Sequence, residues 1–332
     1  MSMDFEPTET QRAIAGLAAE VLCGADPWKE LARSGLLALA VPAELGGEGH
    51  GIGEVATLLT EIGRRALPVP ALGTLAGGVL PIARWGTPAL RRELLPAAAA
   101  GELLLTAATR EPGHAPSHTR STKVDHGLVT GVKVGVPHAA EAHRILVSAD
   151  SGVVLVDPGA PGVTITGTPT IAGEYGGPEY TVGLDAAPVV AVLDGMTARD
   201  LDRLMTAGAC AAADGALAGA LALTRDYVAT RRQFGRPLAE FQAVSQQVAD
   251  VYIASRTLHL IVLSAAWRLG TGRDADGDLA AATWWVTEEA VLAVLICHHL
   301  HGGIGVDVSY PMHRFSSLIR DLSRSLGGAG VH

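Results

Sequence analysis

The sequence of 332 residues contains few cysteines, few aromatic residues and little charge. Cys23, Cys210 and Cys297 lie far apart without a CxxC pair, which argues against a disulfide framework or a zinc site and indicates a reduced, cytoplasmic protein. The net charge of −9 comes without any basic run, so nucleic-acid binding is not expected. The first residues lack the basic segment that begins a signal peptide.

Long uninterrupted apolar runs are missing as well. Stretches such as 290–297 are far shorter than the roughly 18 residues of a membrane span, so we expect no membrane insertion. Charged residues nevertheless make up only 18% of the chain, below the usual share of about 25%, and 48% of the residues are hydrophobic. A large Ala-rich core would explain this composition. We favour a large subunit interface, because several expected helices are apolar nearly all round.

Three regions with different patterns follow one another along the chain. Residues 1–105 predict helices broken by turns. Residues 106–195 contain short β-branched segments separated by Gly, Pro and Asp, which predicts a small antiparallel barrel or sandwich. Residues 196–332 predict a bundle of long helices. The expected fold class is therefore α+β, with an N-terminal helical domain, a middle β domain and a C-terminal helical bundle.

Individual elements can be predicted within these regions. Thr8 can cap a helix over 11–22, and Pro27 stands at a tolerated position early in another helix. The expected strands cover 128–136, 145–148, 153–156, 163–166, 179–184 and 189–193. The expected long helices cover 201–231, 241–269 and 279–300. Small residues at 208, 215 and 219 would let another helix approach the first of these closely.

The segment Arg-Arg-Gln-Phe-Gly-Arg-Pro at 231–237 predicts a helix that runs into a turn, with Gly235 ending the helix. Arg231 can bind a pyrophosphate through two charge-assisted hydrogen bonds. Phe234 offers an apolar face to an adenine or ribose, and Gln242 offers an amide to a base edge. Two solvated arginines at a helix C-terminus would explain the same segment without any ligand.

A second segment, His-His-Leu-His-Gly-Gly-Ile-Gly at 298–305, places glycines where a helix ends. Without side chains, Gly302 and Gly303 let the backbone come close to a ligand. The histidines at 298, 299 and 301 could suggest a metal ion. Because no carboxylate or cysteine completes a familiar spacing, we predict no metal site.

Together, these two segments resemble the signatures of the acyl-CoA dehydrogenase family of flavoproteins, and the resemblance covers essentially the whole chain. Within the family, the sequence is most similar to the shorter subunits of actinobacterial steroid side-chain dehydrogenases, which pair with a longer dehydrogenase subunit. The resemblance implies FAD as the cofactor. The residues that it implies for FAD contacts across a subunit interface are Arg231, Gln233, Phe234, Gln242, His299, Gly302 and Gly303. His299 stands where the family usually has Gln.

The sequence departs from the family at the flavin ring. The family's β domain carries a Trp-Ile-Thr triplet that flanks the ring, and the corresponding positions hold Gly135, Val136 and Pro137. A Thr-Glu-Pro-Gly motif also contacts the ring in the family. Here Arg110 replaces its Thr, although Glu111 and the following Pro-Gly remain.

The catalytic base of the family is missing too. Removal of the α-proton of an acyl thioester requires a carboxylate within about 3 Å. The family places a Glu shortly after an Arg-Asp pair in the last segment or near the start of the first bundle helix. No carboxylate follows Asp321, and residues 204–206 are Leu, Met and Thr. Asp202 lies on a different helical face, and Asp214 is expected to be a satisfied polar core residue, so we predict no catalytic residue.

The resemblance therefore implies a subunit of an α2β2 enzyme that dehydrogenates a steroid side-chain acyl-CoA at its α,β bond. A longer subunit would supply the catalytic Glu, and an electron-transferring flavoprotein is the acceptor usual in the family. Two alternatives stay open. The chain could form a self-sufficient homotetramer with Asp202 or Asp214 as the base, or it could be a structural paralogue without flavin contacts.

Overall fold

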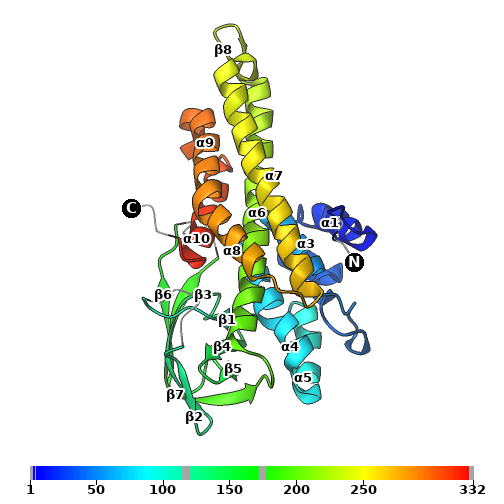
Figure 1. Cartoon of the computed structure of the whole chain (residues 1–332), viewed down its shortest axis with the longest axis vertical. Coiled ribbons are helices and arrows are strands. Elements are labelled where there is room, and N and C mark those ends of the chain that lie inside the picture. The colour runs from blue at the N-terminus through cyan, green and yellow to red at the C-terminus, as the bar shows by residue number, and fades with distance from the viewer. Residues whose placement is uncertain (1–2, 4, 114–119, 172–176, 329–332) are drawn as a thin grey trace. The chain divides into compact units, whose positions relative to one another are not determined.

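The computed structural model describes residues 3, 5–113, 120–171 and 177–328 (Figure 1). The longer helices are α1 (Glu9–Val21), α2 (Pro27–Arg33), α3 (Ile52–Gly63), α4 (Leu80–Trp85), α5 (Pro88–Ala99), α6 (Ala198–Thr230), α7 (Gln242–Gly270), α8 (Asp276–Trp284), α9 (Val291–His301) and α10 (Met312–Ser325). The strands are β1 (Leu105–Ala108), β2 (Lys123–Asp125), β3 (Leu128–Pro137), β4 (Arg144–Ala149), β5 (Gly152–Val156), β6 (Val163–Thr168), β7 (Glu179–Val192), β8 (Arg232–Gln233) and β9 (Arg236–Pro237). This mixed content confirms the α+β class.

Two compact units make up the chain. One comprises residues 1–6, 59–67 and 209–332, and the other comprises residues 7–58 and 68–208. Helices α3 and α6 each begin in the second unit and end in the first. This division does not test the domain boundaries expected from the sequence at 105 and 195, which stay a prediction.

The N-terminal helices begin where the sequence predicts. The Thr8 hydroxyl accepts a hydrogen bond from the Gln11 amide over 3.1 Å, and the Thr8 amide donates to Gln11 Oε1 over 3.0 Å. Such a reciprocal capping box satisfies two amides that the first helical turn leaves without partners. Helix α2 starts at Pro27 behind an Asp26 cap, as expected for a proline whose missing amide costs nothing there.

The sheet of the second unit runs in the order β1-β4-β5-β7-β3-β2, and β6 also pairs with β7. Strands β1 and β4 pair in parallel, so the expectation of a wholly antiparallel arrangement is wrong. The two strands expected over 179–184 and 189–193 are one strand, β7. The chain passes Ala186 at a positive φ of 48°, and the Ala186 amide donates to Thr130 Oγ1, so an irregularity in register replaces the break that the sequence suggested.

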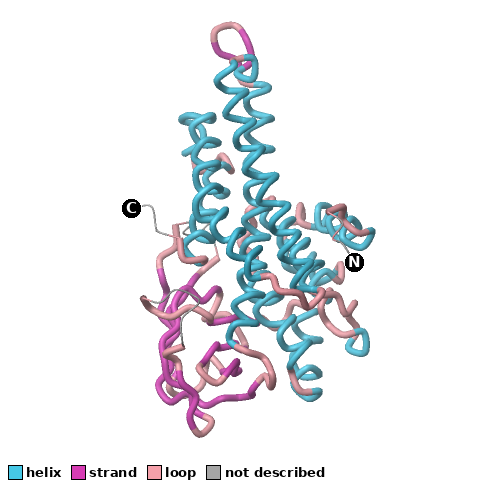
Figure 2. Tube along the Cα trace, viewed as in Figure 1, coloured by secondary structure: helices cyan, strands magenta, loops and turns pink. Residues whose placement is uncertain are grey.

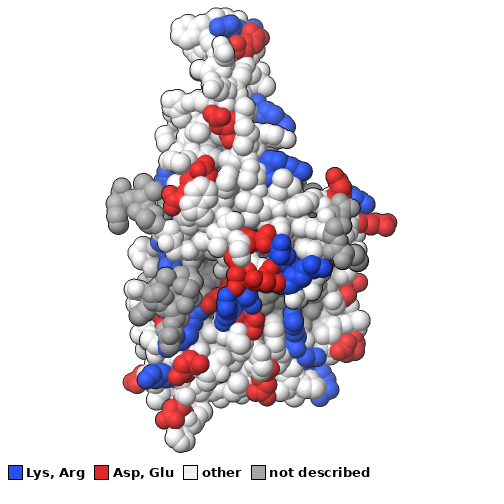
Figure 3. Space-filling model, in the orientation of Figure 1, with Lys and Arg blue, Asp and Glu red and all other residues white. Residues whose placement is uncertain are grey.

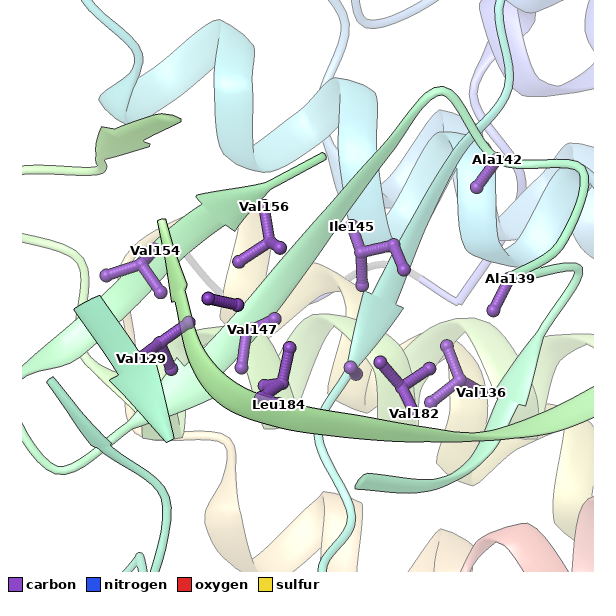
Figure 4. Close-up of a cluster of buried hydrophobic side chains, with 12 residues drawn as sticks. Val129, Val136, Ala139, Ala142, Ile145, Val147, Val154, Val156, Val182 and Leu184 are labelled. Carbon is purple, nitrogen blue, oxygen red and sulfur yellow. The ribbon is translucent and has the colours of Figure 1, made fainter. Parts of the chain in front are cut away.

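A cluster of β-branched and small side chains fills the core of this sheet (Figure 4). Val136, Ile145, Val147, Val156 and Val182 are each at most 1% exposed. Burying a side chain of this size stabilises a fold by roughly 1.5–3 kcal/mol, so these strands depend on their β-branched composition.

Helices α7, α8, α9 and α10 and the C-terminal part of α6 form the bundle of the first unit, with the β8–β9 hairpin at the tip of α6 and α7 (Figure 2). The end of α3 packs on α6 at very close range. A Cβ atom added to Gly215 would lie 1.8 Å from the Thr60 carbonyl oxygen, and the Thr60 hydroxyl donates to the Ala211 carbonyl over 3.1 Å. This confirms that small residues on α6 admit another helix.

Two local predictions about the bundle are wrong. A π-helical turn at Trp285–Ala290 divides the helix expected over 279–300 into α8 and α9. Helix α6 ends at Thr230, so Gly235 does not end it. Phe234 and Gly235 instead form the turn between β8 and β9, with positive φ angles of 51° and 83°. Positive φ at both central residues is the requirement of a type I′ hairpin turn, and glycine satisfies it readily.

Three helical segments are long and apolar enough to cross a membrane by length and composition, namely Ala198–Thr230, Gln242–Gly270 and Asp276–Val306. Isolated charged residues interrupt each of these segments, so none contains a long uninterrupted apolar run, and the expectation from such runs did not include them. The apolar stretch of α6 is 72% buried inside the protein, whereas those of α7 and of α8–α9 are only 33% and 39% buried. The bundle therefore exposes apolar surface that a single chain does not cover.

Candidate functional site

The hairpin at the tip of the bundle presents the first group of predicted site residues. Arg231, Gln233, Phe234 and Gln242 are all exposed, and the Phe234 ring is 92% exposed. The Leu238 amide donates to the Arg231 carbonyl over 2.8 Å, which fixes the base of the hairpin. Among the described residues, the Arg231 guanidinium has no hydrogen-bonding or ion-pair partner. The hairpin thus offers a cation and an aromatic ring to something outside the chain.

The second group lies where α9 ends. Helix α9 stops at His301, and a 3₁₀ turn covers Gly302–Val306. Gly302 has a φ of +60°, and a Cβ atom added to Gly302 or Gly303 would meet no other atom within 4 Å. His299 is exposed beside this open backbone. In the described parts of the chain, no group of three or more His, Cys, Asp or Glu residues could hold a metal ion.

One contact joins these two groups. The rings of Tyr227 and His301 stack with their centroids 4.6 Å apart, and the Tyr227 hydroxyl donates to the His301 carbonyl over 3.4 Å. Tyr227 precedes Arg231 by one helical turn, and His301 directly precedes Gly302. The C-terminal ends of α6 and α9 accordingly point toward the same end of the bundle (Figure 1). Sequence analysis missed Tyr227, although its i, i+4 spacing from Arg231 placed both on one helix face.

The position that corresponds to the flavin wall in the family lies on β3 and has a different character. Gly135 has a φ of +63°, at an irregularity between Lys133 and Val136 in the pairing of β3 with β7. A Cβ atom added to Gly135 would lie 3.1 Å from Arg110 Nη1 and 3.3 Å from Glu179 Oε2. Two charged side chains therefore occupy the space above Gly135 that a larger side chain would take. Sequence analysis singled out Arg110 but missed Glu179.

Glu111 holds a buried network together. Its carboxylate accepts hydrogen bonds from Lys133 Nζ over 2.8 Å and from the amides and hydroxyls of Ser121 and Thr122. Burial by itself raises the pKa of Glu111, but the bonds from Lys133, Thr122 and Ser121 outweigh it and hold the pKa well below its usual range. Burial lowers the pKa of Lys133 to about 8 against the opposing effect of Glu111. The retained Glu therefore has a structural role, and sequence analysis missed Lys133.

The two acids considered as alternative bases each have a partner within the chain. Asp202 forms an ion pair with Arg120, and burial raises the pKa of Asp202 to about 6 even though Arg120 opposes this shift. Asp214 is buried, and its Oδ2 lies 2.8 Å from Nδ1 of His259. This contact confirms the expectation that Asp214 is a satisfied polar residue of the core.

Comparisons with known proteins agree with this architecture. Residues 8–102 match the family model of the acyl-CoA dehydrogenase N-terminal domain, and residues 196–329 match that of the C-terminal domain. The acyl-CoA dehydrogenase FadE28 of Mycobacterium tuberculosis is 46% identical over 98% of this chain and 96% of its own length. The Tcur3481-Tcur3483 steroid ACAD G363A variant matches with a TM-score of 0.87 at 34% identity, covering 97% of this chain and 94% of that chain.

A solved structure of the ChsE4-ChsE5 complex from Mycobacterium tuberculosis also matches with a TM-score of 0.87, at 32% identity over 98% of this chain and 95% of that chain. The chain belongs to the acyl-CoA dehydrogenase family. It is a family oxidoreductase, and FAD is the cofactor.

The residues of this chain fit one part of FAD. Its pyrophosphate and adenosine would fit here, because the Arg231 guanidinium has no partner among the described residues and a Cβ atom at Gly302 or Gly303 would meet open space. Around the isoalloxazine ring, the fit is poor. The aromatic wall is replaced by Gly135, and Arg110 and Glu179 crowd that position. The residues at Gly135 therefore do not suit a flavin ring held by this chain alone.

Proposed function

We propose that this chain is the nucleotide-binding half of a heteromeric acyl-CoA dehydrogenase, an α2β2 assembly in which a longer subunit supplies the isoalloxazine site and the catalytic Glu. The observation that carries the proposal is the contrast between two places in the chain. The Arg231 hairpin and the Gly302–Gly303 loop are open to a ligand, whereas charged side chains take up the space at Gly135. Such a contrast suits a chain that completes the site of another subunit.

Each open residue has a role in this proposal. Arg231 would bind the pyrophosphate with two parallel charge-assisted hydrogen bonds, and the Phe234 ring would pack against the adenosine. The bare backbone at Gly302 and Gly303 would let amides approach the same nucleotide, with Gln233, Gln242 and His299 supplying further polar contacts. When bound, FAD would accept the hydride that leaves Cβ of the acyl thioester. The α-proton would go to the Glu of the longer subunit.

The partner and substrate are proposed from the relatives and from the exposed apolar surface. Two of the matched structures are described as a steroid ACAD and as a two-protein complex, which supports a steroid side-chain acyl-CoA as the substrate and a second dehydrogenase subunit as the partner. Tyr252, Ile253 and Leu292 are 56–60% exposed on α7 and α9. In Figure 3, the upper part of the visible face is mostly uncharged. Obligate interfaces have this apolar character. An electron-transferring flavoprotein would accept the electrons.

The contacts of the two candidate bases favour this proposal over the self-sufficient homotetramer. A general base must reach the substrate proton directly or through one water. Asp202 already forms an ion pair with Arg120, and Asp214 is buried against His259. Neither carboxylate is free for an α-proton, which supports the placement of the base in another subunit.

The test is to co-express this chain with a longer family subunit and to compare Arg231→Ala with Arg225→Ala. Arg225 is a matched control because it lies on α6, six residues before Arg231, and its side chain is 69% exposed. Losing a charge-assisted bidentate contact costs about 1.5–3 kcal/mol, so FAD affinity should fall roughly 10- to 100-fold in Arg231→Ala and stay unchanged in Arg225→Ala.

Two outcomes would contradict the proposal. Unchanged FAD content in Arg231→Ala would favour the structural paralogue, because such a protein makes no flavin contact. If this chain purified alone as a yellow protein that reduces an electron acceptor with an acyl-CoA, the homotetramer would be favoured instead. Flavin absorbance would measure the FAD content of each protein, and subunit stoichiometry would show whether this chain purifies alone or with a partner.

A further inference from the structure

Three aromatic rings meet where α9 ends, and we call them the Tyr–His cluster: Tyr227, His301 and Tyr310. Besides stacking on Tyr227, the His301 ring lies 5.3 Å from the Tyr310 ring, and the two tyrosine rings lie 6.4 Å apart edge to face. The cluster joins α6, the end of α9 and the segment that leads into α10. Tyr227 lies four residues before Arg231, and His301 directly precedes Gly302, so the cluster adjoins both segments of the proposed nucleotide site.

His301 is buried in a way that favours its uncharged form. It is 3% exposed, and its Nδ1 lies 2.8 Å from the Cys297 carbonyl oxygen, so Nδ1 carries the proton and donates it. Among the described residues, Nε2 is buried without a hydrogen-bonding partner. A proton added at Nε2 would therefore be a buried charge without an acceptor, which is costly. Burial lowers the pKa of His301, as this environment requires.

The titratable groups that the described residues place against His301 supply no negative charge to compensate for its protonation. Tyr227 faces it from α6, Tyr310 faces it from the segment before α10, and His298 lies one turn earlier on α9. His298 Nε2 is 2.7 Å from the Ser316 hydroxyl. Beyond His298 lie His313 and Arg320 of α10, which disfavour positive charge there. All of these groups are neutral or cationic near neutral pH.

The cluster also connects the C-terminal end of α6 to the C-terminal end of α9. Tyr227 is fixed on α6 one turn before Arg231, while His301 is the last residue of α9 before the open glycines. The Tyr227 hydroxyl bonds to the carbonyl of His301 itself. Any shift of the His301 ring would therefore move the start of the Gly302–Val306 turn relative to the Arg231 hairpin.

We propose that uncharged His301 is a positioning residue which holds the Gly302–Gly303 loop against Tyr227, and that protonation of His301 releases the loop and weakens nucleotide binding. This inference rests on the proposed function, because the loop is taken as part of the FAD site. A group whose pKa is lowered on folding stabilises the folded arrangement fully above its unfolded pKa of about 6.5 and loses that contribution as the pH falls. Loop order and FAD affinity should both decrease on acidification.

The first experiment uses the co-expressed complex and compares the wild type with His301→Phe, which keeps a ring for stacking but cannot take up a proton. Amide hydrogen exchange at residues 302–306 and the FAD dissociation constant are followed from about pH 7.5 to about pH 5.5, where histidine titrates. In the wild type, FAD affinity should fall by up to about tenfold per pH unit once His301 binds a proton. In His301→Phe, both profiles should be flatter. Equal acid profiles in the two proteins would overturn the proposal.

A second set of variants tests the stack and does not depend on the folding of His301→Phe. Tyr227→Leu removes the ring, and Tyr227→Phe keeps it. Phe5→Leu is the control, at an aromatic residue that is 47% exposed and lies outside the segments proposed for binding. At neutral pH, Tyr227→Leu should speed exchange at 302–306 several-fold and weaken FAD binding. Tyr227→Phe should largely restore both, and Phe5→Leu should change neither.

The outcomes separate this inference from the proposed function. If exchange at 302–306 is unchanged in Tyr227→Leu while Arg231→Ala still loses FAD, the nucleotide site stands and the positioning role of His301 fails. If Tyr227→Leu loosens the loop but FAD stays bound as tightly as before, the loop is not part of the FAD site and the inference fails with it. If Arg231→Ala also keeps its FAD, the proposed function fails.

Discussion

Lys133 Nζ lies 2.8 Å from Glu111 Oε1, and the two side chains are 0% and 2% exposed. This ion pair gives the Glu-Pro-Gly turn a structural role that does not depend on a flavin ring. The carboxylate also accepts four hydrogen bonds from Ser121 and Thr122, so it ties the turn to the segment that leads into β2. Removal of one partner would leave the other charge buried without compensation.

Glu111→Gln should therefore destabilise the protein strongly. Breaking a buried, hydrogen-bonded ion pair by removing one partner typically costs about 3–5 kcal/mol of unfolding free energy. Urea unfolding would measure this loss. Glu48→Gln, at an exposed glutamate in the glycine-rich loop, is the control and should change stability by less than about 0.5 kcal/mol. A similarly small effect for Glu111→Gln would show that the network does not stabilise the fold.

Asp202 should make the free energy of unfolding fall as the pH rises. An ordinary ion-paired carboxylate has a lowered pKa and gives the opposite dependence. Its pKa is raised on folding from 3.8 to about 6, so between these values the folded state binds more protons than the unfolded state. Stability should therefore fall as the pH rises through this window, by on the order of 3 kcal/mol. Urea unfolding between these pH values should show this slope in the wild type and a flatter profile in Asp202→Asn. A steeper profile in the variant would contradict the burial argument.

Close packing of α3 on α6 can be tested with two glycine substitutions that should act in opposite directions. Gly215→Ala would bring a Cβ atom to within 1.8 Å of the Thr60 carbonyl oxygen, so the helices must separate at a cost of about 1–3 kcal/mol. Gly16→Ala, in α1, places its Cβ in open space and should stabilise the protein by roughly 0.5–1 kcal/mol through helix propensity. Thermal unfolding checks both, and equal effects of the two would refute close packing as the cause.

The glycine loop offers a comparison between neighbours. Gly302 needs a positive φ of 60°, which costs a residue with a side chain about 1–3 kcal/mol, whereas Gly303 has no such requirement and also faces open space. Gly302→Ala should therefore weaken FAD binding in the co-expressed complex by roughly 5- to 100-fold. Gly303→Ala adds a methyl group without backbone strain. It should therefore weaken FAD binding only if the nucleotide lies against the backbone at Gly303. Titration with FAD measures both. Unchanged affinity in Gly302→Ala would argue against the loop as a binding element.

Local signals in the sequence predicted the ends of several elements correctly. Thr8 followed by Gln11 specifies a capping box, and Pro27 specifies a helix start, because both act on residues within one turn. The hairpin at 231–237 was missed because a two-residue turn with positive φ was not expected at Phe234, and Gly235 was taken as a helix end. Strand β7 was divided in two because Pro188 and the small residues before it suggested a turn, although pairing with β3 carries the strand through.

The sequence by itself determined the family and the α+β class, because these depend on short motifs and local patterns. Arg231, Phe234, Gly302 and Gly303 stay predicted FAD contacts that rest on the same motifs. Only the tertiary structure decided what those residues contact. It paired Lys133 with Glu111, Arg120 with Asp202, and Tyr227 with His301, across 22, 82 and 74 residues. Such pairings depend on burial, which excludes water and makes each polar group find a partner, and no local pattern records which distant residue that partner is.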